Sequence, residues 1–488
     1  MPQELKPVAG ADRRIVDVGV LKMAVAPQAH TIGQLRESGY QVLPIREELR
    51  NNLIAKIRAE ELLFPGIIGF EETVIPQLEN AILAGQDLIL LGERGQAKSR
   101  LIRGLVGLLD EYVPIIAQCE INDNPYSPVC RACRDKVADQ GDETPIEWIA
   151  RDRRYSEKLA TPDISIADLI GEIDPIKVAE GRHLSDELTI HYGLVPRTNR
   201  GIFSINELPD LAERIQVGLF NLMEERDVQI KGYRLSLPLD VYVVATANPE
   251  DYTNRGRIVT PLKDRYGAQI HTHYPKSLEQ EILIMEQERS RFPEEENLVV
   301  PDYMTKVIAE ITAQARQSNE INQRSGVSVR VSISNYETLL SNAVRRSIRH
   351  GNQIACPRIS DLPYISASMG GKIELETFED GREGRVTEEL TRRAVLRIFG
   401  EYFDVEELED TVTAFDLGTV ADTGSEKQAA GYEEFLNSVD GLQPAVGRLT
   451  EDKRPEVIAS AVEFILEGLH LSRRLNCERT PTGYRYKR

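Results

Sequence analysis

The sequence predicts an α/β fold with a parallel, doubly wound sheet, followed by a helical lid and a small C-terminal helical region. Three apolar runs, at residues 88–91, 201–206 and 240–248, support this prediction. Each run ends at a group of polar residues. Helix-like segments separate the runs, and strands that alternate with helices are typical of a largely parallel sheet. The region from about residue 276 onward contains further helical patterns.

The first of these strands leads into a glycine-bearing loop, Gly92–Ser99, with the sequence GERGQAKS. The loop matches G-x-x-x-x-G-K-[ST], except that Ala97 stands where the second glycine is expected and Gly95 lies inside the loop. Backbone N–H groups of such a loop surround phosphate oxygens, while Lys98 neutralises charge and Ser99 can bind Mg²⁺. The loop therefore predicts binding of ATP and Mg²⁺. The other residues predicted to contact the nucleotide are Glu93, Arg94, Gln96 and Arg100.

The second strand ends at Asn206 and Glu207. Two carboxylates at such a position normally divide two tasks, one holding the Mg²⁺ shell and the other polarising the attacking water. Here the first group is an amide, so Asn206 can hydrogen-bond a metal-bound water but brings no negative charge. We expect Glu207 to act as the general base; the alternative is an ordinary exposed glutamate.

Three further side chains are candidates. Asn248, at the end of the third strand, is placed to position water beside the γ-phosphate, although Asn-Pro after a strand is also a common turn. Arg265 ends a short predicted helix from which it could reach the nucleotide of a neighbouring subunit; the alternative is an ion pair with Asp264. Arg330 begins a lid helix and could contact the nucleotide from there.

The five cysteines do not form a disulfide framework in so long a chain. Three of them cluster in the sequence as Cys119, Cys130 and Cys133, the last two as C-x-x-C. A fourth soft ligand is missing nearby, because His183 and His191 are distant in sequence. A zinc or iron–sulfur site is one interpretation, and reduced thiols in a loop is the one we prefer.

Bulk composition limits the function. With 488 residues the chain predicts roughly three domains, and 41% hydrophobic residues suffice for packed cores. A net charge of −19 argues against nucleic acid as the main partner, because phosphate backbones need a basic surface. No apolar run has the length of a membrane span, and the N-terminal residues lack the apolar core of a signal peptide. We expect a cytoplasmic location.

These observations predict five segments. They are an N-terminal extension (1–62), an α/β nucleotide-binding domain (63–275) with a cysteine-bearing insert at about 119–165, a helical lid (276–400), an acidic linker (401–430) and a C-terminal helical region (431–488).

Taken together, the motifs resemble those of the AAA+ ATPases, in the branch that contains the magnesium-chelatase I subunit and the MoxR proteins. The resemblance covers about residues 66–350 and is strongest from GLVPRTNRGIFSINELPD to VVATANPED. In that branch alanine is usual before the lysine. The resemblance implies Walker A at Gly92, Gly95, Lys98 and Ser99, Walker B at Asn206 and Glu207, sensor 1 at Asn248, an arginine finger at Arg265 and sensor 2 at Arg330.

The resemblance also implies a function: an ATP-hydrolysing hexameric ring that remodels or activates a partner, with a von Willebrand A-domain protein as the expected partner. A hairpin at 228–238 and an insertion at 168–195 would transmit motion. One alternative is a scaffold that binds ATP but hydrolyses it slowly, because Asn206 lacks charge. Another is an AAA+ transcription activator or helicase, against which the acidic charge argues.

Overall fold

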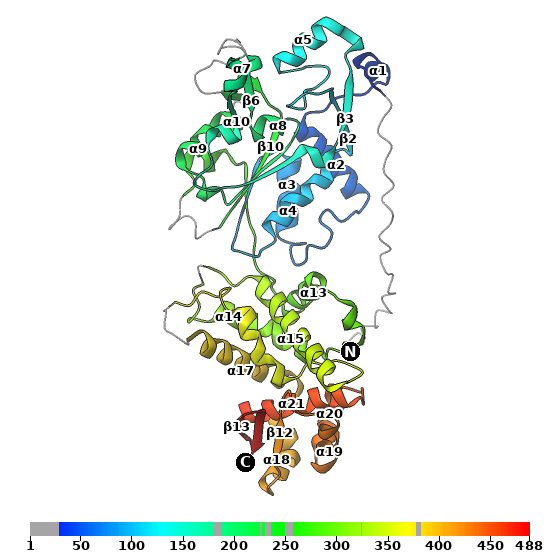
Figure 1. The fold of residues 1–488 in the computed structure, drawn as a ribbon, viewed down its shortest axis with the longest axis vertical. Coiled ribbons are helices and arrows are strands. Elements are labelled where there is room, and N and C mark those ends of the chain that lie inside the picture. The colour runs from blue at the N-terminus through cyan, green and yellow to red at the C-terminus, as the bar shows by residue number, and fades with distance from the viewer. Residues whose placement is uncertain are drawn as a thin grey trace, which may run out of the picture.

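The protein is described by a computed structural model that covers residues 29–179, 187–224, 227–229, 236–248, 257–323, 325–376 and 382–488. An α/β body and a helical body lie one above the other along the long axis (Figure 1). The predicted nucleotide loop belongs to the α/β body, on the side that faces the helical body.

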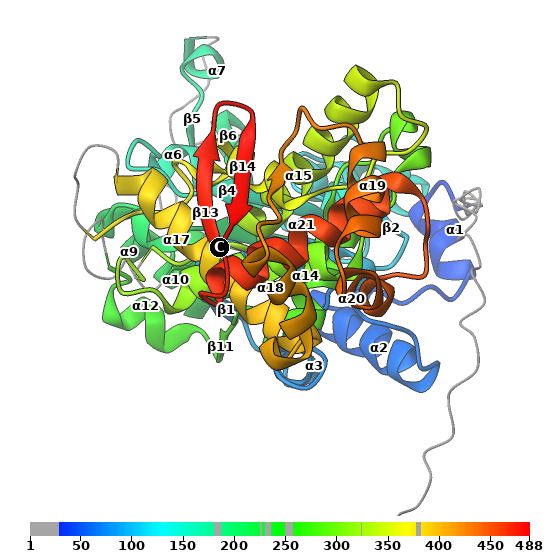
Figure 2. The same ribbon diagram turned by 90° about the horizontal axis from the view of Figure 1, so that it is seen from below.

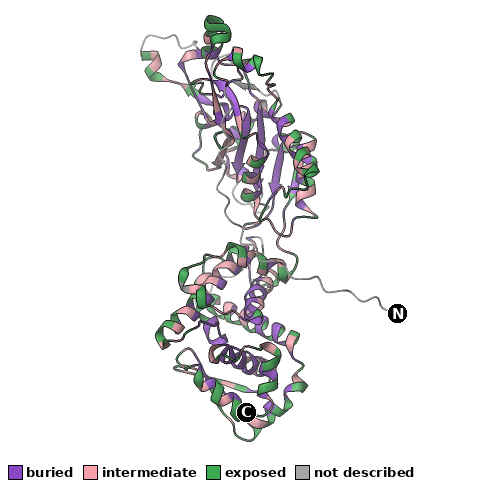
Figure 3. Cartoon of the chain, turned by 90° about the vertical axis from the view of Figure 1, so that its right-hand side faces the viewer, coloured by how far each residue is buried: buried purple, intermediate pink, exposed green. Residues whose placement is uncertain are grey.

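A five-stranded parallel sheet forms the centre of the α/β body, with the order β11-β1-β10-β7-β4. The three central strands are buried along their whole length, and Figure 3 shows them as the buried interior of this body. Alternate residues of β1 enter two different apolar cores, Leu88 and Leu90 on one face and Ile89 and Leu91 on the other. Both faces are therefore covered, which confirms the predicted doubly wound parallel sheet. The strands are β1 Leu88–Leu91, β4 Tyr155–Leu159, β7 Gly201–Asn206, β10 Val241–Ala247 and β11 Ala268–His271.

Short helices and hairpins surround this sheet. Three further pairs form two-stranded antiparallel sheets: β2 with β3, β5 with β6, and β8 with β9. Parts of the predicted 228–238 hairpin and 168–195 insertion lie outside the described residues. The helices are α1 Ile32–Glu37, α2 Ile45–Arg58, α3 Val74–Leu83, α4 Lys98–Gly104, α5 Arg131–Gln140, α6 Ile166–Leu169, α7 Pro175–Ala179, α8 Leu194–Arg197, α9 Glu213–Gly218, α10 Phe220–Glu224 and α12 Thr260–Arg265; the strands are β2 Tyr112–Ile116, β3 Ile146–Ala150, β5 Gly171–Ile173, β6 Ile190–Tyr192, β8 Asp227–Gln229 and β9 Ser236–Pro238.

Two of the sequence boundaries differ from the structure of this body. Helix α2 was expected in a separate extension, but its Leu49 and Leu53 are buried in the core on one face of the sheet. A buried ion pair between Glu48 and Arg154, 2.6 Å apart, fixes the helix there. Strand β4 was expected within the cysteine-bearing insert but forms the edge of the main sheet, where its polar residues are half-buried. Its low apolar content hid it from a search for hydrophobic runs.

The helical body has one large apolar core that runs from α13 to the C-terminal strands. Its centre is α21, which is buried on nearly every side, as expected for a helix that is apolar all round. Figure 2 shows the β13–β14 hairpin beside this helix. The elements are α13 Leu278–Glu288, α14 Asp302–Gln317, α15 Val329–His350, α16 Ser366–Met369, α17 Arg382–Tyr402, α18 Glu409–Asp416, α19 Ala430–Ser438, α20 Leu442–Leu449 and α21 Pro455–Leu471, with strands β12 Ala421–Thr423, β13 Asn476–Thr480 and β14 Gly483–Lys487.

The acidic segment 401–430 is structured where a linker was expected. Helix α18 buries Val412 and Phe415 in the common core, and β12 pairs with β14. The acidic residues that suggested a linker lie on the outer face of this amphipathic helix. The three-stranded sheet β12-β14-β13 was not predicted either, because its strands are short and polar.

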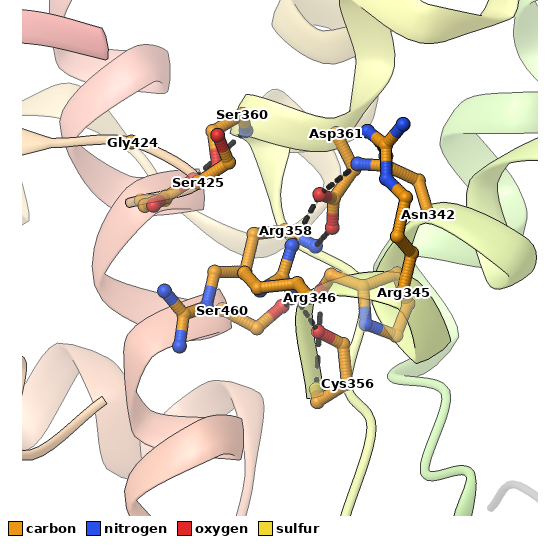
Figure 4. Close-up of polar contacts among 12 residues, drawn as sticks. Asn342, Arg345, Arg346, Cys356, Arg358, Ser360, Asp361, Gly424, Ser425 and Ser460 are labelled. Carbon is orange, nitrogen blue, oxygen red and sulfur yellow. Dashed lines mark hydrogen bonds and ion pairs between the residues drawn. The ribbon is translucent and has the colours of Figure 1, made fainter. Parts of the chain in front are cut away.

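A buried polar seam joins the lid helices to the C-terminal helices (Figure 4). The Asp361 carboxylate forms an ion pair with Arg346 and accepts the backbone N–H of Arg358 at 2.8 Å. Ser460 on α21 donates its hydroxyl to the Pro357 carbonyl at 2.6 Å. The lid and the C-terminal region therefore pack as one unit. Among the described helices, none combines the length and the apolar content needed to cross a membrane.

Candidate nucleotide-binding site

The loop between β1 and α4 has the backbone conformation that a phosphate-binding loop needs. Gly95 and Ala97 both lie in the left-handed region, with φ of 76° and 54°. This conformation is easy for glycine but costs an alanine about 1 kcal/mol, so the alanine is held there by the surrounding fold. Lys98 follows directly as the first residue of α4, and Ser99 is half-buried in the same turn.

The loop packs so tightly that its first glycine has no room for a side chain. A Cβ at Gly92 would lie 2.0 Å from the Thr272 hydroxyl oxygen and 2.3 Å from Gln96 Oε1. Gln96 Oε1 accepts two hydrogen bonds, from the Glu93 N–H at 3.0 Å and from the Thr272 hydroxyl at 2.7 Å. The predicted loop residue Gln96 thus shapes the loop from within instead of facing outward.

Lys98 joins the loop to the third strand. Its ammonium donates to the carbonyls of Gly92 and Glu93, the latter at 2.7 Å, and to Asn248 Oδ1 at 2.7 Å. Asn248 follows β10, and the Gly92 N–H donates to the Ala247 carbonyl at 3.1 Å. The structure thus brings together the predicted phosphate-binding lysine and the predicted sensor asparagine.

The second strand places Asn206 and Glu207 beside this pair. The Glu207 backbone is left-handed, with φ of 55°, and its N–H donates to the Thr246 hydroxyl at 3.0 Å, two residues before Asn248. Strained backbone of this kind is common at functional positions. Among the described residues, none forms a hydrogen bond or ion pair with the Glu207 carboxylate. This arrangement brings the predicted general base to the strand next to the predicted sensor.

Sequence reasoning missed one carboxylate at this site. Glu157 on β4 accepts a hydrogen bond from the Asn206 side-chain amide. It also binds Arg103 of α4 through two hydrogen bonds of 2.8 and 2.9 Å and accepts from the Tyr155 hydroxyl at 2.9 Å. The hydrogen bonds from Arg103 lower the pKa of Glu157, which stays ionised. The negative charge absent at Asn206 is thus present on the adjacent strand.

Glu157 also determines how the Asn206 amide is turned. An ionised carboxylate can only accept hydrogen bonds, so it is the Asn206 N–H₂ group that points to Glu157. Asn206 Oδ1 therefore lies on the opposite side, 3.5 Å from the Thr246 hydroxyl. The only sequence signal for this residue was a charged position in YSEKL, a segment that was not recognised as a strand.

The two predicted arginines have different surroundings. Arg265, at the end of α12, donates to Glu224 at 3.0 Å and to the Pro261 carbonyl at 2.8 Å, and it lies over the Phe220 ring. The ion pair that was considered as an alternative thus exists, but with Glu224 in place of Asp264. Within this chain, no hydrogen bond or ion pair links Arg265 to the described loop residues.

Arg330 lies where the lid meets the loop. It is the second residue of α15 and is exposed, and the N-cap of that helix, Ser328, touches the loop: a Cβ at Gly95 would lie 1.9 Å from its hydroxyl oxygen. Two loop-proximal ion pairs also reach the helical body, Arg94 with Glu374 at 3.8 Å and Arg100 with Glu288. In this conformation Arg94 and Arg100 are thus paired with carboxylates of the helical body.

Comparisons with known proteins agree with these features. No protein-family model matches the chain. The magnesium-chelatase subunit ChlI of Nostoc sp. is 28% identical over 270 residues, which cover 52% of this chain and 65% of that protein. The chloroplastic subunit ChlI-2 of Arabidopsis thaliana is 25% identical over 284 residues, 55% of this chain and 63% of that protein. The chain thus spans less than two thirds of the length of these relatives.

A solved assembly of magnesium-chelatase subunits BchI and BchD is a weak structural neighbour, with a TM-score of 0.34 and 18% identity over 67% of this chain and 98% of that one.

The strand order, the loop between β1 and α4 and the polar strand ends together give the nucleotide-binding fold expected of an AAA+ protein, followed by a helical body. Within that class the chain is related to the magnesium-chelatase I subunits. The predicted fold class and the predicted branch are confirmed.

Proposed function

We propose that this chain is a cytoplasmic ATPase that binds ATP and Mg²⁺ at Gly92–Ser99 and uses hydrolysis to remodel or activate a partner protein. The observation that carries the proposal is the contact of Lys98 with Asn248, with Glu207 at the end of the neighbouring strand. The loop, Asn248 as the proposed sensor and Glu207 as the proposed base follow the carboxyl ends of three adjacent parallel strands, where open α/β sheets bind their ligands.

The residues present fit a nucleotide and its metal. Gly95 and Ala97 give the loop the left-handed backbone that a phosphate-binding loop needs, and the Ser99 hydroxyl and the Asn206 oxygen are of the hard type that Mg²⁺ prefers. Bound Mg²⁺ would neutralise charge on the phosphates. In this scheme Lys98 neutralises the outer phosphates, Asn248 orients the attacking water, and Glu207 accepts its proton.

The ring and its partner are part of the same proposal. The curated relatives are named as subunits of magnesium chelatase, so we propose that this chain also acts in a multisubunit assembly. We propose a hexamer in which Arg265 exchanges Glu224 for the nucleotide of the neighbouring subunit, and in which Arg330 contacts the nucleotide from the lid. A von Willebrand A-domain protein and a MoxR-like role remain the proposed partner and function.

The experiment measures ATP binding and phosphate release separately for the wild type, Lys98→Ala and Glu207→Gln. We expect Lys98→Ala to weaken binding, and Glu207→Gln to retain binding while phosphate release falls by ~10²-fold or more. Native mass spectrometry in the presence of ATP and Mg²⁺ measures the number of subunits in the assembly. A second candidate function is an ATP-dependent scaffold, which the uncharged amide at Asn206 supports. Tight ATP binding together with the same near-zero phosphate release in the wild type and Glu207→Gln would favour it.

A further inference from the structure

A cluster of four potential metal ligands lies in the α/β body, distinct from the nucleotide loop. One ligand atom from each of Cys119, Asp123, Cys130 and Cys133 lies within 4.8 Å of all the others. Cys119 and Asp123 belong to the loop after β2, Cys130 is the N-cap of α5, and Cys133 lies in the first turn of that helix. The fold thus supplies the fourth ligand that the sequence lacked, and it is a carboxylate instead of a histidine.

The backbone around the sulfurs is arranged as it is around metal-bound thiolates. The Cys119 sulfur accepts N–H groups from Ile121 and Asp123, each at 3.4 Å, and the Cys130 sulfur accepts the N–H of Cys133 at 3.4 Å. Such bonds favour the thiolate, which is the form that binds metals. The loop that carries Cys119 is bent by left-handed backbone at Gln118 and Asn122.

Asp123 gives an independent sign that this cluster binds a cation. Its side chain is fully buried, and its Oδ2 accepts the Cys130 N–H at 3.0 Å. Its Oδ1 is buried and has no hydrogen-bond partner among the described residues. A buried carboxylate oxygen without a partner is costly unless it is paired with a cation or binds a metal.

We propose that Cys119, Asp123, Cys130 and Cys133 together bind one Zn²⁺ ion as a structural site. A tetrahedral ion with Zn–S bonds of about 2.3 Å places its sulfurs about 3.8 Å apart, which the observed cluster can reach with small side-chain rotations. Three thiolates select a soft or borderline ion, and four protein ligands leave no open position for catalysis. An iron–sulfur cluster holds several irons and needs its cysteines farther apart than the 4.8 Å that bounds this cluster.

The position of the site indicates what the ion stabilises. The Asn122 amide, between two of the ligands, donates to the Arg197 carbonyl at 2.9 Å, just before the strand that ends at Asn206. The buried Glu187 accepts the Arg131 N–H at 2.7 Å and binds the Arg134 guanidinium at 2.9 Å, which fixes the start of α5. The ion would thus tie the loop after β2 and helix α5 to the segment that leads into β7.

The test begins with the full chain, purified without chelators and under reducing conditions, and measures its metal content by mass spectrometry. We expect one zinc per chain. Replacement of this zinc by Co²⁺ should give the visible absorption bands of a tetrahedral ion and a thiolate-to-cobalt charge-transfer band. Because this measurement uses the wild type, it does not depend on whether a variant folds.

Variants then assign the ligands. We expect Cys133→Ser and Asp123→Ala to weaken zinc binding at least ~100-fold, since even second-sphere changes cost roughly 10- to 100-fold. Asp123→Cys should retain one zinc per chain, because four thiolates also bind it. Cys477→Ser is the matched control, since this half-buried cysteine lies in β13, outside the cluster, and the variant should bind zinc like the wild type.

Three results would overturn the proposal. One is a wild type that contains no metal and takes up neither Zn²⁺ nor Co²⁺ at micromolar concentration. The second is a different state of the cysteines, shown either by stoichiometric iron with the visible absorption of an iron–sulfur cluster or by a disulfide between two of them in the reduced preparation. The third is unchanged zinc content in both Cys133→Ser and Asp123→Ala.

Discussion

The pairing of Asn206 with Glu157 predicts that restoring a carboxylate at position 206 harms the protein. From sequence alone, Asn206→Asp repairs an incomplete Walker B motif. In the structure the Asn206 amide donates to Glu157, and an aspartate there would have nothing to donate. Two carboxylates would instead face each other on adjacent parallel strands.

The size of the effect follows from the contacts. A hydrogen bond to a charged group contributes about 1.5–3 kcal/mol. Two unit charges about 4 Å apart repel by roughly 4 kcal/mol at an effective dielectric constant of about 20. Arg103 offsets part of this repulsion, because it stays on Glu157 through two hydrogen bonds. We expect Asn206→Asp to lower the free energy of unfolding by about 2–4 kcal/mol at neutral pH.

The assay is a double-mutant cycle of urea unfolding with Asn206→Asp, Glu157→Gln and the exchanged pair that carries both substitutions. The single tryptophan of the chain, Trp148 in β3, makes fluorescence specific for the α/β body. In the exchanged pair the new glutamine on β4 can donate to the new aspartate on β7, so we expect a favourable coupling energy of about 2 kcal/mol. Glu147→Gln on β3 is the matched control and should not couple with Asn206→Asp. Wild-type stability for Asn206→Asp, with coupling below ~0.5 kcal/mol, would refute the reasoning.

The remaining predictions concern the loop, the core, the ring and pH. Gly92→Ala should abolish ATP binding measured by calorimetry, since its Cβ would overlap the Thr272 hydroxyl; retained affinity would contradict this packing. Arg154→Ala should destabilise the α/β body by about 3–5 kcal/mol in urea unfolding, because it leaves the buried Glu48 carboxylate without its ion-pair partner and, among the described residues, with only the Asp110 N–H as a hydrogen-bond donor. Lys98→Ala and Arg265→Ala chains, each inactive alone, should recover part of the ATPase activity when mixed if Arg265 acts on the neighbouring subunit; no recovery would argue against a finger. The lowered pKa of Glu157 means that its stabilising contribution is complete above the unfolded carboxyl pKa of about 4.3 and is lost as the pH falls through its folded value. Wild type and Glu157→Gln should therefore differ in urea midpoint at neutral pH and converge at low pH.

Local sequence was enough to predict the parts of the site that lie on one continuous segment. The loop at Gly92–Ser99, the strand end at Asn206 and Glu207, and Asn248 each follow an apolar run that is buried on both faces. Such runs are visible because a central parallel strand must be hydrophobic along its whole length. The same signal failed for β4, an edge strand, and with it the contribution of Glu157 was missed.

The sequence by itself determined the loop at Gly92–Ser99 between a strand and a helix, the position of its lysine and the parallel sheet beneath it, because these depend on neighbours in the chain. Only the tertiary structure decided which distant groups meet. In the structure Lys98 donates to Asn248, Asn206 donates to Glu157, and Arg265 forms an ion pair with Glu224. Asp123 lies among three cysteines. Each of these is a polar contact between side chains on different elements. Sequence patterns record where apolar residues must be buried, but they do not record which buried polar groups satisfy one another.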